Sequence, residues 1–200
     1  MKNTTDAAYL ETFLAPLRVC ANYLPAFGLS DEQVAWKYEY TKSRRQKAFH
    51  ILDARISVSD VRSSESATRM ESWLTSAQKA AGGDRHHKSQ GAIFEIRQGY
   101  KSADSKRQNA DLRFGARAYQ AAHIPVVAIL SSQVSETVIS RYRDAGMLIM
   151  TGIPSRDPTE STFAFFDQII GYDLAGFFRR SSAAIKQEIH GLIEKLLSTE

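Results

Sequence analysis

The chain has 200 residues, 43% of them hydrophobic, with a formal net charge of +4 and one cysteine. That length suits one compact domain, and no window approaches the roughly 18 apolar residues that a membrane span needs. The first residues carry Asp6 and Glu11 where a secretory signal would be apolar, and Cys20 alone can form no internal disulfide, so we expect a cytoplasmic protein without a membrane segment.

The positive charge is concentrated in one part of the sequence. Residues 85–117 hold eight lysines and arginines against three acids, which leaves +5 and accounts for the whole excess. A second basic cluster occupies residues 42–47. Concentrated positive charge is typical of a surface that binds a polyanion, although a solvated face would also explain both clusters.

The first part of the chain is predicted to be mainly helical. Residues 5–21 have apolar positions at helical spacing. Ser30 and Gln33 form the pattern of a capping box, which predicts a long helix that runs as far as Ile51 or breaks at the basic cluster. A short strand over residues 56–61 follows, and then a helix from Ser63 or Ser64 to about residue 80 that the two glycines at 82 and 83 end.

The central stretch begins with a strand. Residues 91–98 alternate so that Ile93 and Glu95 share one face while Phe94 and Ile96 share the other. Gly99 ends this strand, and Ser102 can cap a following helix. The apolar positions predicted for that helix are Ala110, Phe114, Ala118 and Ala121.

The second half reads as buried strands that alternate with helices. Residues 125–130 and 147–150 are short apolar runs, separated by a helix that Ser135 caps and Gly146 ends. Three helices are predicted after them: one capped by Asp157 and closed by Gly171, one starting at Asp173, and a last one over residues 182–197.

This order predicts one α/β domain, with a small mixed central sheet flanked by helices and parallel neighbours joined by right-handed crossovers. Residues 1–80 would form a helix-rich N-terminal part, residues 84–151 the sheet core, and residues 157–200 the C-terminal helices.

Two acids and a cation near the central strand suit metal-assisted chemistry on a phosphate. Asp84 precedes the strand, and Glu95 and Arg97 lie on one face of it. Mg²⁺ prefers carboxylate oxygens together with waters and substrate phosphate, and a nearby cation stabilises the charge that develops during phosphodiester cleavage. The alternatives are a turn residue at position 84 and a surface ion pair between Glu95 and Arg97.

Several further stretches stand out: residues 95–111, Ala118-Tyr119, the strand at 125–130, Ser131-Ser132-Gln133, Arg141-Tyr142-Arg143 and residues 171–178. Through these stretches, residues 94–178 resemble type II restriction endonucleases of the PD-(D/E)xK superfamily, in particular the group around ApaLI.

The resemblance implies a restriction-endonuclease-like fold and a magnesium-dependent enzyme that cuts both strands of a short DNA palindrome as a homodimer, without an organic cofactor. Asp84 matches the first acid of the motif and Glu95 the second, while Arg97 stands in place of lysine and Gly83 in place of proline. Arginine cannot act as a base, so Arg97 would stabilise charge, or Lys101 would supply the ammonium group. An N-terminal acid such as Glu71 could join the site.

The helix after the central strand is the predicted DNA-binding element. Lys106, Arg113 and Arg117 share one face, and Gln108 and Asn109 carry amides that can read base edges. Arg107 adds a further cation on this helix, and Gln133, at the end of a buried strand, is a predicted polar contact to the substrate. A solvated helix with a few ion pairs is the alternative.

Two other functions remain open at this stage. A DNA- or RNA-binding protein of the same fold that has lost catalysis would explain the arginine at position 97. An α/β enzyme acting on a small phosphorylated substrate would also suit the sheet, but its affinity for polynucleotides should depend little on salt.

Overall fold

The computed structural model describes residues 28–41, 46–82, 88–99 and 105–198. A four-stranded sheet lies at the centre, in the order β3 (Ala54–Ser57), β4 (Gly91–Arg97), β5 (His123–Ile129) and β6 (Leu148–Met150). β3 runs antiparallel to β4, whereas β4, β5 and β6 are parallel to one another. The predicted α/β class with a small mixed sheet is therefore confirmed.

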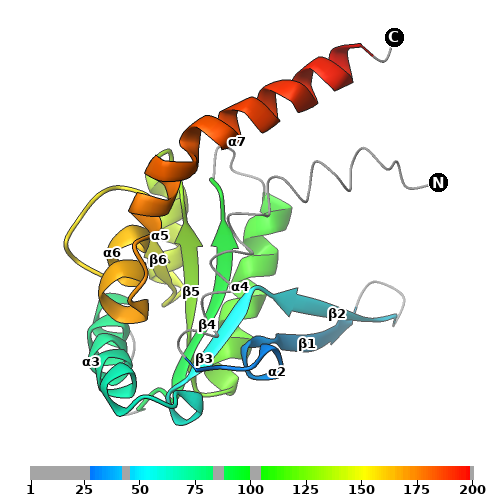
Figure 1. The fold of residues 1–200 in the computed structure, drawn as a ribbon. Helices are drawn as coiled ribbons and strands as arrows, with labels where there is room; N and C mark the ends of the chain where they lie inside the picture. The colour runs from blue at the N-terminus through cyan, green and yellow to red at the C-terminus, as the bar shows by residue number, and fades with distance from the viewer. Residues whose placement is uncertain (1–27, 42–45, 83–87, 100–104, 199–200) are drawn as a thin grey trace.

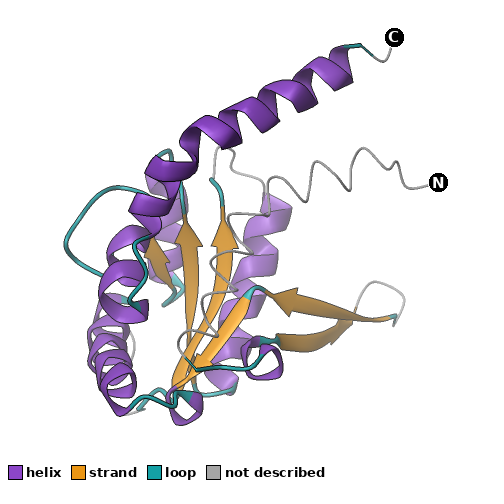
Figure 2. Ribbon diagram, viewed as in Figure 1, coloured by secondary structure: helices purple, strands orange, loops and turns teal. Residues whose placement is uncertain are grey.

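Helices cover both faces of this sheet (Figures 1 and 2). α4 (Ser105–Gln120) and α5 (Glu136–Asp144) pack on one face. The other face is covered by α3 (Ser64–Ala80), α6 (Thr162–Phe165), the π-helical turn η4 (Phe166–Ile170) and the first turn of α7 (Leu174–Leu197). Among the described helices, none is both long enough and apolar enough to cross a membrane.

β4 separates two apolar cores because its side chains alternate. Phe94 and Ile96 belong to the larger core with α3, and Ile93 belongs to the smaller core with α4 and α5. The sequence predicted this division of faces, and it sends Glu95 and Arg97 toward α4, on the same side as Ile93.

The first residue of β4 has to be glycine. A Cβ atom at Gly91 would lie 2.0 Å from the backbone oxygen of Ile56 on β3. Gly91 is paired with Ser57 on one side and His123 on the other, and the Ser57 hydroxyl contacts His123 Nε2 across it at 2.9 Å. This buried hydrogen bond joins β3 to β5 at the end of the sheet remote from Glu95.

The long helix predicted after Ser30 is wrong. The capping box itself forms, with Ser30 N donating to Gln33 Oε1 at 2.8 Å and Gln33 N donating to Ser30 Oγ at 3.3 Å. However, α2 (Asp31–Val34) has only four residues. It is followed by the antiparallel strands β1 (Trp36–Thr41) and β2 (Lys47–Leu52), and then by β3 of the central sheet. Both hairpin strands alternate between half-buried and exposed residues, which is a period of two and therefore strand-like.

α3 agrees with its prediction, since Ser63 caps it by accepting from Ser66 N and its apolar positions face the core. The short strand predicted at 56–61 is found earlier, as β3, and is followed by the 3₁₀ turn η3 (Val58–Asp60). The N-terminal part is thus not simply helical. The predicted helix at 5–21 and the predicted cap at Ser102 lie outside the described residues.

Two predictions about the C-terminal part are wrong. Asp157 does not cap a helix, because its Oδ1 accepts hydrogen bonds from the backbone and hydroxyl of Thr159, and α6 begins later with Ser161 as its cap. The two helices predicted after Gly171 are one helix, α7, in which the Asp173 carboxylate accepts from Gly176 N at 2.6 Å. No proline interrupts this segment, so nothing breaks the helix.

Candidate functional site

A cluster of charged side chains lies at the C-terminal end of β4. Glu95 and Arg97 share a face of the strand, and Arg97 Nη2 lies 3.2 Å from Glu95 Oε1. Their side chains are only 16% and 12% exposed, so the pair sits in a partly desolvated position where charges interact more strongly than in water. The sequence prediction that these two residues meet on one face is confirmed.

Asp111 anchors this pair from α4. It lies on the buried stripe of the helix together with Phe114 and Ala118 and is almost completely buried. Arg97 Nη2 donates to Asp111 Oδ1 at 2.5 Å, and the hydroxyl of buried Tyr142, on α5, donates to Asp111 Oδ2. Two helices on one face of the sheet therefore hold the charges that project from β4.

Asp53 brings a further carboxylate to the same end of the sheet. It directly precedes β3, and its Oδ2 accepts a hydrogen bond from Ile96 N at 2.7 Å. Because Ala54 is paired with Phe94 in the antiparallel register, continuing that register by one residue places the backbone of Asp53 opposite Glu95. Asp53 is exposed to solvent on one side, and partial desolvation of its carboxyl raises the pKa, while the Ile96 hydrogen bond and the charges of Arg97 and His50 act in the opposite direction.

The hairpin of β1 and β2 forms a side wall of this cluster. His50 Nδ1 and the Tyr38 hydroxyl are 2.9 Å apart, and burial lowers the pKa of His50 while it raises the pKa of Tyr38 to about 12. His50 is also within the electrostatic influence of Asp111, Arg97, Arg113 and Asp53. The hairpin packs on α4 through a ring contact between Trp36 and Phe114, with centroids 6.4 Å apart.

The charge of the cluster suits a divalent cation. Asp53, Glu95 and Asp111 are three carboxylates; Arg97 pairs with two of them, and Arg113 also acts electrostatically on this region. Within the described part of the chain, no group of three or more His, Cys, Asp or Glu side chains could hold a metal ion. Mg²⁺ requires fewer, since it commonly uses one or two carboxylates and keeps several waters. Asp53 and Glu95 are the two candidates for that role, with Glu95 paired to Arg97, whereas Asp111 is buried between Arg97 and Tyr142.

Comparisons with protein-family models, with curated proteins and with solved structures found no match. The arrangement of the residues themselves therefore carries the functional interpretation.

Two of the residues predicted to be catalytic, Asp84 and Lys101, lie outside the described residues. Asp53 occupies the position near Glu95 that the sequence analysis gave to Asp84. Its position in the sequence could have revealed it. Asp53 stands directly before β3, and β3 is the strand that precedes β4, which carries Glu95 and Arg97. Asp111 was also missed, although an acid at the same helical spacing as Phe114 and Ala118 indicates a buried charge with a partner.

The predicted DNA-binding residues do not all lie together. Arg113 and Arg117 are exposed on α4, with Arg113 lying over the Tyr40 ring at 5.8 Å. Gln108 is only 4% exposed, and its Oε1 accepts from Arg141 Nη1 at 2.5 Å, so it is poorly placed to read a base edge.

The remaining DNA-binding predictions involve exposed or undescribed side chains. Asn109 is exposed, with its Oδ1 accepting from Arg141 Nη2 at 2.8 Å. Gln133 is also exposed, at the turn after β5. Lys106 and Arg107 belong to α4, but their side chains are among those not described.

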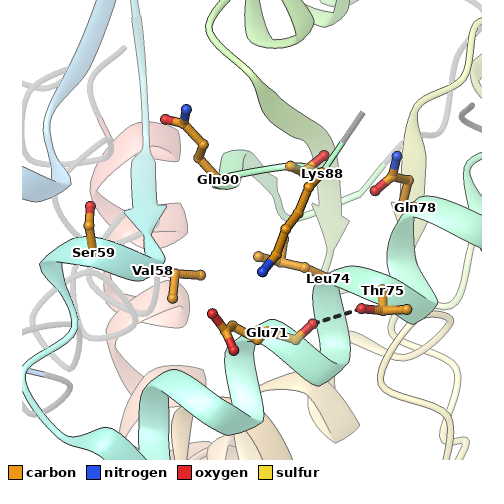
Figure 3. A pocket seen from close by; sticks show the side chains of 9 residues that line it. Val58, Ser59, Glu71, Leu74, Thr75, Gln78, Lys88 and Gln90 are labelled. Carbon is orange, nitrogen blue, oxygen red and sulfur yellow. Dashed lines mark hydrogen bonds between the residues drawn. The ribbon is translucent and has the colours of Figure 1, made fainter. Parts of the chain in front are cut away.

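Glu71 does not join the cluster. Its carboxylate points into a cavity of about 550 Å³ between α3 and the segment that enters β4 (Figure 3). Lys88, Ser89 and Gln90 line the opposite wall of this cavity. The cavity therefore lies at the N-terminal end of β4, about 13 Å along the strand from Glu95 at roughly 3.3 Å per residue.

Proposed function

We propose that this protein is a magnesium-dependent DNA endonuclease that hydrolyses phosphodiester bonds. The observation that carries the proposal is that Glu95 lies beside Arg97 near the end of β4, where the carboxylate of Asp53 accepts a hydrogen bond from Ile96 N. Two carboxylates from neighbouring strands at one sheet margin, with a cation two residues along, are what metal-assisted attack on a phosphodiester requires.

Each residue of the cluster has a role in this proposal. Asp53 and Glu95 would hold Mg²⁺, which when bound activates water and neutralises charge on the phosphate. Arg97 stays protonated, so it would stabilise negative charge at the scissile phosphate and would not act as a base. Lys101 remains a candidate for a second cation. Arg113 and Arg117 would contact the DNA backbone, with Lys106 and Arg107 on the same helix.

The finer part of the proposal rests on the resemblance to the PD-(D/E)xK superfamily. It comprises a restriction-endonuclease-like fold, cleavage of both strands at a short palindrome, a homodimer and a cytoplasmic location. The antiparallel strands β3 and β4 are compatible with that fold, since Asp53 directly precedes β3 and Glu95 lies near the C-terminal end of β4. A two-fold symmetric dimer would match a palindromic site.

The test is cleavage of plasmid DNA of known sequence with and without Mg²⁺. We expect discrete fragments only with the metal, and we expect Glu95→Ala and Asp53→Asn to abolish cleavage while DNA binding persists. Glu71→Ala is the matched control, because it removes an acid at the far end of β4 and should leave the rate unchanged. Asp84→Asn separates the two candidates for the first acid. Cleavage by Glu95→Ala at the wild-type rate would refute the site.

A second function is favoured by one specific observation, the pairing of Arg97 with two carboxylates. In a DNA- or RNA-binding protein without catalysis, this ion-pair network would only stabilise the fold. Such a protein would retard a plasmid in a gel and leave it intact with Mg²⁺ present.

A further inference from the structure

The outer face of the β1–β2 hairpin exposes large apolar side chains to water. The inner face is accounted for, because Trp36 and Tyr38 pack against the smaller core beside α4. On the opposite face, Phe49 and Ile51 lie two residues apart on β2 and are 60% and 72% exposed. Figure 1 shows that the hairpin projects away from the central sheet. Neighbouring exposed apolar side chains on a projecting ribbon are typical of a surface that contacts a partner.

The same face is also positively charged. Lys37 is exposed, and its Nζ lies 5.5 Å from the centre of the Phe49 ring. Residues 36–52 contain five lysines and arginines against one acid, Glu39, which is an excess of +4. The Glu39 carboxylate is itself paired with Lys47, at 3.1 Å. The outer face therefore combines apolar side chains with an excess of cations.

The charge of the hairpin decides which kind of partner fits it. A second copy of the chain, related by a two-fold axis, would bring the same excess of positive charge against this face, and like charges repel. A polyanion would be attracted instead. The positive surface also continues onto α4, where exposed Arg113 lies over the ring of Tyr40 on β1 at 5.8 Å, and Arg117 is exposed one turn further along.

We propose that the outer face of the hairpin docks into the major groove of duplex DNA, with Lys37 at the phosphates and Phe49 and Ile51 against the base edges. This inference rests on the proposed function, because it takes DNA as the partner. The major groove of B-DNA is about 12 Å wide and admits a two-stranded ribbon. Its thymine methyl groups provide the apolar contacts that Phe49 and Ile51 would make.

The test is binding of the full-length protein to a fluorescently labelled A·T-rich duplex, measured by anisotropy in EDTA over a range of salt concentrations. We expect Phe49→Thr/Ile51→Thr to weaken binding about tenfold or more, because two apolar contacts are lost. The slope of log affinity against log salt should not change, because apolar side chains release no counterions. Lys37→Ala should instead reduce that slope by about one.

The substitutions are chosen so that the fold survives. Both apolar side chains are exposed, and threonine has a high strand propensity, so the double variant should unfold within a few degrees of wild type. Ile153→Thr is the matched control. Ile153 is 50% exposed and follows β6, at the opposite edge of the sheet from β3, so its replacement should change neither the affinity nor the slope.

Three results would overturn the inference. The first is wild-type affinity in the folded double variant, and the second is a wild-type protein that binds no duplex. The third is a wild-type dimer, measured by light scattering, that Phe49→Thr/Ile51→Thr dissociates, since the outer face would then bind a second copy of the chain.

The endonuclease proposal fails by a different result. If the protein binds duplex DNA through the hairpin but cuts no plasmid with Mg²⁺ present, the docking role of the hairpin stands and the nuclease activity does not. If the protein cuts the plasmid and the double variant binds DNA like wild type, the nuclease activity stands and the role of the hairpin does not.

Discussion

Tyr142→Phe should destabilise the fold more than a matched change at another tyrosine. The substitution keeps a fully buried ring in place and removes only the hydroxyl that donates to Asp111. Tyr119→Phe is the matched change, because that hydroxyl also makes one hydrogen bond, to the backbone oxygen of Gly146, from a residue that is 38% exposed. The two variants thus compare a hydrogen bond to a buried charge with one to a neutral acceptor.

The charge on the acceptor sets the expected difference. A hydrogen bond to a charged group contributes about 1.5–3 kcal/mol, against about 0.5–1.5 kcal/mol for a neutral pair. For a domain of this size each kcal/mol shifts the unfolding midpoint by about 2–4 °C. Tyr142→Phe should therefore lower the midpoint by about 3–12 °C, and Tyr119→Phe by about 1–6 °C.

Thermal unfolding followed by circular dichroism, at neutral pH and without metal, measures both midpoints. A Tyr142→Phe midpoint equal to or above that of Tyr119→Phe would mean that the Asp111 carboxylate does not depend on this hydroxyl. The reasoning about the buried ion pair would then be refuted together with the role given to α5.

Three further predictions concern pH and DNA. Asp53→Asn should unfold at slightly higher urea than wild type at pH 7, because partial desolvation raises the pKa of this carboxyl, which solvent still screens, so the folded state loses a little stability as the pH rises through that value. The gap should close near pH 3, and a constant gap would argue against titration of Asp53. His50→Gln should flatten the pH dependence of stability. The lowered pKa of His50 makes the wild type lose stability as the pH falls below about 6.5. An unchanged slope of unfolding free energy against pH between pH 7 and 5 would contradict this. Arg117→Ala should weaken binding to duplex DNA and reduce the salt slope by about one, whereas Lys79→Ala, on the opposite side of the sheet, should do neither.

The sheet and most of its helices could be predicted because their signals are local. The run from Pro125 to Leu130 is apolar throughout and could only be a strand buried on both faces, and Ser63 and Gly82 mark the ends of α3. The hairpin is not predicted because the capping box at Ser30 marks where a helix begins but not how long it is, and α2 ends after four residues. The alternation in Trp36–Thr41 and Lys47–Leu52 was the stronger signal.

The candidate site was only partly predictable, because strand register decides which acids meet. The spacing of Glu95 and Arg97 along one strand fixes their common face without further knowledge. Asp53 reaches the backbone of Ile96, next to Glu95, through the antiparallel pairing of β3 with β4, which α3 separates in sequence, and sequence spacing gives no hint of that pairing. Asp111 and Tyr142 meet through the packing of α4 against α5, which is also a tertiary event.

Because β4 separates two hydrophobic cores, most of the residues that stabilise the fold lie on one face of the strand and the charged residues of the candidate site lie on the other. Glu95 and Arg97 lie on the face that α4 and α5 cover. The larger hydrophobic core, with Met70, Trp73 and Phe165, lies on the opposite face. Replacements in that larger core should alter how firmly the protein holds together and leave the spacing of the charged groups nearly untouched. Random substitution followed by selection for heat resistance should therefore accumulate changes in the larger core, on the α3 face of β4, and leave the residues on the α4 face unchanged.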